Sequence, residues 1–444
     1  MINYNYNRND IRHGIVHFGV GNFHRAHLEY YTNLLLENPD QQQWGVFGAM
    51  IMPSDGVLYK ALKEDDGVYN LTTCAPDGEN ITYRIGSLIN LAWGEEDPQA
   101  IISAIADPLI KIISLTITEG GYSVDLDSPK SVFWYITEGL KQRMAKNLPI
   151  SILSCDNLQH NGDTAKKAFM SYFTAKSPDL ARWAIDNVSF PNSMVDRITP
   201  ATKSGKITDV RCEDFIQWVI EDNFKAGRPA WDKVGAQFTS DVAPYENMKL
   251  SLLNGAHSLL CYGAYLEGFR KVDEVMSDNR YKTLVRNFMD LDVTPFVPAP
   301  EGINLDVYKD TLIRRFANPA ISDQVYRLCA DGLARFAVYI VPTLKLMFNK
   351  GKDTIRLAFH FANYYKYLIR AVTESGESIN IEEPHMTAED KAIISGGDMR
   401  EFFKLSPYKN VDFLSQKEFI CNFERFVSLS VSEGLEIILN RKTK

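Results

Sequence analysis

The stretch that decides the fold runs Gly14-Ile-Val-His-Phe-Gly-Val-Gly-Asn-Phe-His-Arg-Ala-His27. It begins with a short β-branched and aromatic run that ends in Gly19-x-Gly21, and apolar residues at helical spacing follow from Leu28 to Glu37. This order predicts a strand, a glycine turn and a helix. In a dinucleotide-binding turn the first glycine allows the tight bend, and the second lets the backbone approach a pyrophosphate at the helix N-terminus. Gly19 and Gly21 fit these roles, but His24 stands at the third glycine position of a full GxGxxG pattern, so an ordinary strand-to-helix turn remains an alternative.

Strand and helix patterns alternate along the first half of the chain. A second apolar run covers 44–51, about one helix length after the first, as a βαβ unit requires. Further patterns predict strands at 81–85, 110–116 and 150–154, and helices at 99–105 and 131–146. Such alternation is typical of an α/β fold built on a parallel sheet.

The pattern changes after about Asp241. Over most of 247–440 the apolar residues recur every three or four positions, and strand signals are few. We therefore predict two domains. Residues 1–240 form a Rossmann-type dinucleotide-binding domain of the α/β class, and residues 241–444 form a mostly α-helical domain that binds substrate and supplies catalytic groups.

Composition excludes several classes of function. The 444 residues carry 48 Lys and Arg against 56 Asp and Glu, a net charge of -8 without a dense basic stripe, so nucleic acid is not expected as a partner. No apolar run approaches the ~18 residues of a membrane-spanning helix, and the first residues lack the apolar core of a signal peptide. The six cysteines form no CxxC pair. We expect a cytoplasmic protein that handles a small molecule away from the membrane; the composition carries no information on oligomeric state.

The segment Tyr245-Glu-Asn-Met-Lys-Leu-Ser-Leu-Leu-Asn-Gly-Ala-His257 mixes polar and apolar residues on one predicted helix face. At about 100° per residue, that face carries Glu246, Lys249, Leu250, Leu253, Asn254 and His257. Because ionisable groups are costly to bury without partners, such a face indicates a pocket in which polar groups converge. A desolvated lysine there acts as a general base, and Asn and His polarise a carbonyl oxygen. The alternative is a surface helix on which Glu246 and Lys249 pair, with His257 in the core.

Two polar loops follow predicted strands. Thr118-Glu-Gly-Gly-Tyr122 follows one of them, and Ser154-Cys-Asp-Asn-Leu-Gln-His-Asn-Gly162 follows another. The second loop offers Asn157 and Asn161 near the carboxyl end of a strand, where ligands of open α/β sheets bind. Both loops also fit turns that use Gly, Asp and Asn for local backbone bonds.

Two further features concern the cofactor and metals. The end of the second strand, Met50-Ile-Met-Pro53, lacks the acidic residue that normally accepts the ribose hydroxyls, and Asp55 is the nearest candidate. This feature leaves the choice between NAD and NADP open; NAD is the expected cofactor, with NADP not excluded. His24 and His27 are the one close histidine pair and no HExxH pattern is present, so we expect no metal site.

Five stretches together resemble the polyol-specific long-chain dehydrogenase/reductase family, most closely its members that oxidise mannitol. They run in family order and comprise Gly19–His27, Thr118–Tyr122, Ser154–Gly162, Met194–Pro200 and Lys249–His257. The resemblance implies a Rossmann-type N-terminal domain, a largely helical C-terminal domain and a metal-independent reaction in the cleft between them. The chain departs from the family at Met52-Pro53, where the usual acidic residue is displaced, and this weakens any prediction of cofactor preference.

The resemblance also implies a role for individual residues. The lysine of the family's K-x4-N-x2-H pattern is the general base, which falls on Lys249. Asn157 and Asn254 would hold the reacting oxygen. His257 and Arg327 would contact the substrate, and Glu246 would exchange protons with solvent. The residues assigned to the cofactor are Gly19, Gly21, Phe23, His24, Asp55, Thr118 and Glu119.

The expected activity is the NAD(P)-dependent interconversion of a sugar alcohol and a ketose, with mannitol and fructose as the first choice and arabinitol or sorbitol as further candidates. A hexuronate reductase acting on fructuronate or tagaturonate is the nearest rival, and it would need a cationic contact from Arg327, Arg335 or Arg25 for the carboxylate. A non-catalytic dinucleotide sensor is a third alternative. Retention of the whole Glu246, Lys249, Asn254 and His257 face argues against the sensor.

Overall fold

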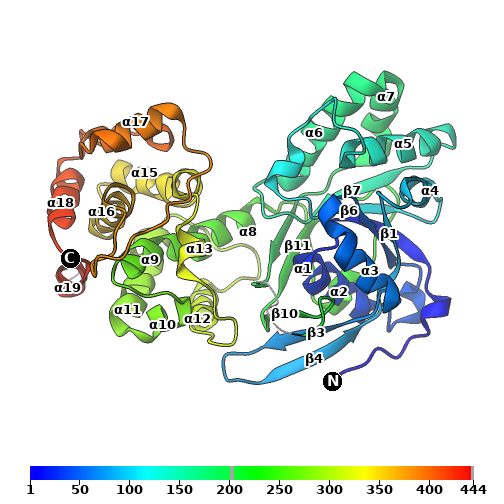
Figure 1. The fold of residues 1–444 in the computed structure, drawn as a ribbon, viewed down its shortest axis with the longest axis horizontal. Helices are drawn as coiled ribbons and strands as arrows, with labels where there is room; N and C mark the ends of the chain where they lie inside the picture. Colours follow the sequence, from blue (N-terminus) through cyan, green and yellow to red (C-terminus); the bar gives the residue numbers. More distant parts are fainter. Residues whose placement is uncertain (201–204, 442–444) are drawn as a thin grey trace. The chain divides into compact units, whose positions relative to one another are not determined.

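The computed structural model describes residues 1–200 and 205–441. It divides into two compact units, Met1–Ala243 and Pro244–Lys444, drawn in Figure 1. Each unit has its own hydrophobic core: two large clusters of buried side chains lie within the first unit and one within the second. Each unit therefore buries enough apolar surface of its own to be treated as a separate structure.

The first unit is built on a six-stranded parallel sheet with the strand order β5-β2-β1-β6-β7-β8. The strands are β1 (His13–Phe18), β2 (Gly45–Met50), β5 (Leu88–Trp93), β6 (Ile112–Leu115), β7 (Ile150–Ser154) and β8 (Val188–Ser189). The chain moves outward from β1 to β5 and then returns to β6 on the other side of β1. This reversal creates a topological switch point between β1 and β6, and ligands of such sheets bind at the carboxyl ends of these strands.

Helices cover both faces of this sheet (Figure 1). They are α1 (Asn22–Ala26), α2 (Leu28–Leu35), α3 (Gly56–Glu64), α4 (Pro98–Ala106), α5 (Val132–Ala145), α6 (Asn161–Lys176) and α7 (Pro178–Asn187). Val16 and Phe18 pack with residues of α4 to α7, whereas Ile15, the residue before Val16, packs with residues of α2 and α3. Because β1 is buried on both faces, it reads as a continuous apolar run.

Most of the expected elements of this unit are confirmed. The strands expected at 44–51, 110–116 and 150–154 are β2, β6 and β7, and the expected helices at 99–105 and 131–146 are α4 and α5. The strand expected at 81–85 exists as β4 (Asn80–Ile85), but its place in the alternation was wrong, because it pairs antiparallel with β3 (Tyr69–Cys74) in a separate sheet. On this side the edge strand of the parallel sheet is β5, which is only partly buried.

Four further short strands complete the two small sheets. β10 (Val210–Glu213) extends the β3–β4 sheet, and β9 (Ser193–Asp196), β11 (Gln217–Glu221) and β12 (Gln237–Thr239) form a third sheet in the order β12-β11-β9. None of these strands was predicted from the sequence. They are short, and their length gives a periodic pattern little room to develop.

The second unit is helical, as expected. Its helices are α8 (Ala243–Met248), α9 (Gly255–Leu266), α10 (Val272–Ser277), α11 (Asn279–Asn287), α12 (Leu305–Phe316), α13 (Val325–Cys329), α14 (Gly332–Arg335), α15 (Val341–Asn349), α16 (Ile355–Arg370), α17 (Ala388–Gly396), α18 (Lys417–Ser428) and α19 (Val431–Leu439). Three π-helices interrupt this set: η6 (Lys249–Asn254), η7 (Phe288–Val293) and η8 (Phe336–Ile340).

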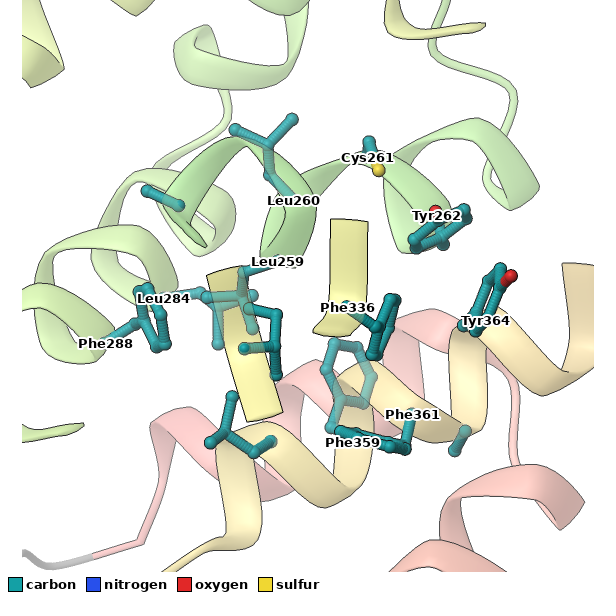
Figure 2. Close-up of a cluster of buried hydrophobic side chains, with 14 of the residues drawn as sticks. Leu259, Leu260, Cys261, Tyr262, Leu284, Phe288, Phe336, Phe359, Phe361 and Tyr364 are labelled. Atoms are coloured by element: carbon teal, nitrogen blue, oxygen red, sulfur yellow. The ribbon is translucent and has the colours of Figure 1, made fainter. Parts of the chain in front are cut away.

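Helix α9 lies at the centre of the second core. Figure 2 shows Leu259 and Tyr262 of α9 facing a layer of rings that includes Phe336, Phe361 and Tyr364. Eleven of the twelve residues of α9 are buried. Because η6 leads directly into this fixed helix, the packing of α9 also fixes the position of the lysine segment. Within the described ranges, no helix is long and apolar enough to cross a membrane.

Candidate active site

The glycine turn after β1 has the two features that a nucleotide-binding turn needs. Gly19 has a φ of +93°, and a Cβ there would lie 2.0 Å from the carbonyl oxygen of Thr116, so only glycine fits. A Cβ at Gly21, at the start of α1, would meet nothing closer than the Gly19 oxygen at 3.9 Å. The first glycine therefore closes the turn against β6, and the second leaves an exposed stretch of backbone. These are the positions that fit a dinucleotide pyrophosphate.

The other proposed cofactor residues also lie at the carboxyl ends of the strands of this sheet. Thr116 follows β6, and its hydroxyl donates to the Gly19 carbonyl oxygen at 2.6 Å, which joins β6 to the turn. Thr118 and Glu119 follow it and are exposed, as is Asn157 after β7. Asp55 lies beyond the end of β2, where its carboxylate accepts the Met52 N–H at 2.9 Å. The carboxyl ends of four neighbouring strands thus carry these residues around the switch point.

His24 occupies a different environment from the exposed residues. Its side chain is buried, its ring stacks on His17 with centroids 3.4 Å apart, and its Nε2 lies 2.9 Å from Oε1 of buried Glu29. Burial lowers the pKa of His24 well below 6.5, and burial raises the pKa of Glu29 to about 8, so this is a neutral hydrogen bond at pH 7. The His24 side chain packs beneath the turn, inside the unit. Because this side chain is buried, only the backbone of His24 could contact a cofactor. Phe23, the preceding residue, stacks on His27.

In the second unit, the lysine segment is not a plain α-helix. Lys249–Asn254 forms the π-helix η6, in which the Gly255 N–H bonds to the Leu250 carbonyl five residues earlier. The prediction of 100° per residue through this segment was therefore wrong. A π-turn holds one more residue than an α-turn, and such turns are rare and often found at functional sites.

The extra residue of the π-turn reduces the range of angles around the helix axis over which the polar side chains lie. With one residue absorbed by the π-turn, Asn254 and His257 lie about 40° and about -20° from Lys249 around the axis, where a plain α-helix would give about 140° and 80°. Glu246, in α8 before the π-turn, stays at about 60°. Glu246, Lys249, Asn254 and His257 therefore form a polar stripe along the helix, and this stripe covers a narrower range of angles than the sequence pattern predicted.

The environment of this stripe is buried and polar. Lys249, Glu246 and His257 are 6%, 4% and 8% exposed, and the His257 ring stacks on Phe316 with centroids 4.0 Å apart. The side-chain oxygen of Asn254 is buried and has no hydrogen-bond partner among the described residues. A buried amide oxygen without a partner is costly, and a hydroxyl group of a ligand would satisfy it.

Arg327 lies near this stripe and is held by a neighbouring carboxylate. Its Nε and Nη2 bond to Oδ1 and Oδ2 of Asp323 at 2.8 and 2.5 Å. Burial raises the pKa of Asp323, but Arg327 and, less strongly, the nearby His257 outweigh burial and hold the pKa below its usual value. Asp323 therefore stays ionised and matches the charge of Arg327. The sequence analysis did not identify Asp323, although an Asp–Arg pair at i, i+4 is a recognisable helix signal.

The two asparagines of the second polar loop of the first unit differ in burial. Asn157 is exposed, whereas Asn161 is buried and donates to the Asp156 and Ser193 carbonyl oxygens at 3.0 and 2.8 Å. Asn161 thus holds the loop and Asn157 remains accessible. Among the residues described, no group of three or more His, Cys, Asp or Glu side chains is arranged to hold a metal ion.

Comparison with known proteins identifies the family. Residues 13–233 match the Mannitol dehydrogenase Rossmann domain and residues 241–425 match the Mannitol dehydrogenase C-terminal domain. The chain is 36% identical to the polyol:NADP oxidoreductase of Gluconobacter oxydans, over 91% of this chain and 90% of that one. It is 36% identical to the D-mannonate oxidoreductase of Escherichia coli, over 85% and 84% of the two chains.

A solved structure agrees over almost the full length. The mannitol 2-dehydrogenase of Pseudomonas fluorescens, in a ternary complex with NAD and D-mannitol, is 37% identical, with a TM-score of 0.86 over 99% of this chain and 97% of that one. The chain belongs to the mannitol dehydrogenase family and is a nicotinamide-dependent oxidoreductase that acts on a CH–OH group.

Proposed function

We propose that this enzyme interconverts a neutral sugar alcohol and its ketose, with mannitol and fructose as the preferred pair and NAD as the preferred cofactor. One observation carries the proposal: the π-helix aligns buried Glu246, Lys249 and His257 with Asn254, whose buried oxygen has no partner. Such a stripe suits the transfer of a proton and the binding of a hydroxyl group, and it suits neither a solvated surface nor an apolar core.

In the proposed reaction, Lys249 is the general base. Its Nζ, neutral before the reaction, takes the proton from the C2 hydroxyl of the polyol as the C–O⁻ character develops. Glu246, one helical turn before it and also buried, passes that proton on toward solvent. A bound nicotinamide would supply the acceptor for the hydride from C2 in this direction and the donor in the other.

The developing negative charge needs donors fixed in advance. We assign the amide groups of Asn157 and Asn254 to the reacting oxygen, in the role that preorganised donors play in other hydride and acyl transfers. His257, held against Phe316, contacts a neighbouring substrate oxygen. Asn157 belongs to the first unit and the stripe belongs to the second.

The charges near these residues favour a neutral substrate over a hexuronate. Arg327 is matched by Asp323, and Arg335 donates to the Arg327 and Leu328 carbonyl oxygens. Arg25 is buried in the first unit, where it donates to the Thr208 carbonyl and to Asn22. All three candidate cations therefore have partners within the protein, and a substrate carboxylate would have to compete with them.

The test measures the turnover of a panel of substrates through the absorbance of the reduced nicotinamide. Mannitol, arabinitol, sorbitol, fructose, fructuronate and tagaturonate are each assayed with NAD(H) and with NADP(H). We expect the highest kcat/KM for mannitol oxidation and fructose reduction with NAD(H). A higher kcat/KM for either hexuronate would replace the polyol with an acid substrate. NADH binding without turnover of any compound would indicate a dinucleotide sensor and overturn the proposal.

A further inference from the structure

The buried carboxylate of Asp156, after β7, accepts hydrogen bonds from three donors in the loop that follows β6. Asp156 follows β7 and is 7% exposed. Its Oδ1 accepts the Thr118 N–H at 2.8 Å, and its Oδ2 accepts the Ile117 N–H at 3.1 Å and the Tyr122 hydroxyl at 2.6 Å. All three donors lie in the loop after β6. Both carboxylate oxygens accept; burial raises the pKa of Asp156, and the bonds from Tyr122, Ile117 and Thr118 oppose that rise.

The loop held by Asp156 contains a strained residue. Thr118 has φ 63° and ψ 169°, a region of backbone space that is populated almost only by glycine. Such a conformation costs on the order of 1–3 kcal/mol for a residue with a side chain, and it persists only where its surroundings impose it. Asp156 holds the chain on both sides of the Thr118 Cα: it accepts the Ile117 and Thr118 N–H groups before that atom and the Tyr122 hydroxyl after it.

These contacts reach the glycine turn through one more residue. Thr116 lies just before Ile117: its N–H donates to the Phe18 oxygen at 2.9 Å, and its hydroxyl donates to the Gly19 oxygen at 2.6 Å and lies 2.9 Å from Nε2 of His17. A continuous set of hydrogen bonds thus links the end of β7, the loop after β6 and the turn after β1. These are the three strand ends around the switch point.

Asp156 is also fixed from its own backbone. Its carbonyl oxygen accepts the Asn161 amide at 3.0 Å and the Leu158 N–H at 2.9 Å, and its N–H donates to the Ser154 hydroxyl at 3.3 Å. The exposed Asn157 lies between these anchors. A displacement of Asp156 would therefore move both the loop at Thr118 and the base of Asn157.

We propose that Asp156 is a positioning residue for the cofactor site: its carboxylate holds Thr118 in the strained conformation that shapes the cofactor-binding edge after β6. The proposal rests on the proposed cofactor site, not on the identity of the polyol. Asp156 itself need not touch the cofactor or the substrate.

The test is a double-mutant cycle read by NADH binding to the full-length enzyme. Asp156→Asn keeps the shape of the side chain but places an amide NH2 against an N–H or hydroxyl donor. We expect the Kd for NADH to rise about tenfold, the effect of losing one charge-assisted hydrogen bond. Thr118→Gly removes the strain, because glycine adopts this conformation at little cost. In the Thr118→Gly background, Asp156→Asn should therefore change the Kd by less than about threefold.

Two further variants keep the result interpretable. Tyr122→Phe removes one bond to the carboxylate and keeps the ring, so it should give a smaller rise in Kd if Asp156→Asn does not fold. Asp127→Asn, in the exposed part of the same loop region, should leave the Kd unchanged. A wild-type Kd for Asp156→Asn, or an equal effect in both backgrounds, would overturn the proposal. NADH binding is measured without polyol, so a failure of the proposed substrate would leave this result intact.

Discussion

At the scale of single residues, Glu29 connects the glycine turn to the stability of the first unit. Its carboxyl group is buried, bonds to His24 and Ser87, and has its pKa raised by burial from 4.5 to about 8. The folded unit therefore keeps a proton on Glu29 at a pH at which the unfolded chain has lost it. By linkage, the contribution of this group to stability falls as the pH rises from about 4.5 to about 8.

This predicts a pH-dependent difference between the wild type and Glu29→Gln. Glutamine stays neutral and keeps the hydrogen-bonding shape, so the variant should lose less stability on going from pH 6.5 to pH 8. The difference should reach about 2 kcal/mol over that interval, from about 1.36 kcal/mol per pH unit. Thermal unfolding of both proteins at several pH values measures it. Parallel curves would show that Glu29 is already ionised in the folded protein.

Asp323 leads to a prediction about specificity. Asp323→Asn keeps the shape of the side chain but removes the charge that matches Arg327. The guanidinium would then be available to a substrate carboxylate, so the ratio of kcat/KM for fructuronate to that for fructose should rise by about three- to fivefold, the scale of one partly exposed ion pair. Asp310→Asn, an exposed acidic residue on α12, is the control. An unchanged ratio would mean that Arg327 does not face the substrate.

At the scale of elements, η6 determines how the stripe is built. If the π-turn serves to bring Asn254 and His257 into line with Lys249, then the register of the flanking helices matters more than the π-turn itself. Deleting Ser251 would convert the segment to an α-helix and keep Lys249, Asn254 and His257 at i, i+4 and i+7. Inserting an alanine after Ser251 would rotate Asn254 and His257 by about 100°.

The two changes should therefore have different effects. The deletion should keep activity within about tenfold of the wild type, whereas the insertion should lower kcat by about 10²-fold or more, the cost of misplacing a catalytic group. Far-UV circular dichroism and Tm establish that both proteins are folded. Equal losses of activity in two folded proteins would contradict the register argument.

The same segment shows what a sequence pattern does and does not predict. The pattern placed Glu246, Lys249, Asn254 and His257 on one face, and the structure has them on one face, but at different angles because no periodicity signals a π-turn. Strands β1, β2, β6 and β7 were predictable because they are buried on both faces. The roles of Asp156 and Glu29 were not, since each depends on partners from distant segments and, for Asp156, on the backbone angle of Thr118.

At the scale of the whole molecule, the two units divide the proposed work. The glycine turn, Thr118 and Asp156 belong to Met1–Ala243, and the lysine stripe belongs to Pro244–Lys444. Because the first unit has its own core, residues 1–243 expressed alone should fold and bind NADH within about tenfold of the full-length affinity, without turnover. Fluorescence titration with NADH checks this. A folded fragment that does not bind NADH would mean that the second unit supplies essential cofactor contacts.

The central claim concerns both units at once: the first holds the cofactor and Lys249 of the second moves the proton. The most direct test is Lys249→Ala, with exposed Lys345→Ala as its control, assayed for fructose reduction by NADH and for NADH affinity. We predict that kcat falls by ~10²–10⁴-fold, the usual contribution of a general acid–base group, while the Kd for NADH stays within about twofold of the wild type. A folded Lys249→Ala enzyme that retained most of the wild-type kcat would contradict the account.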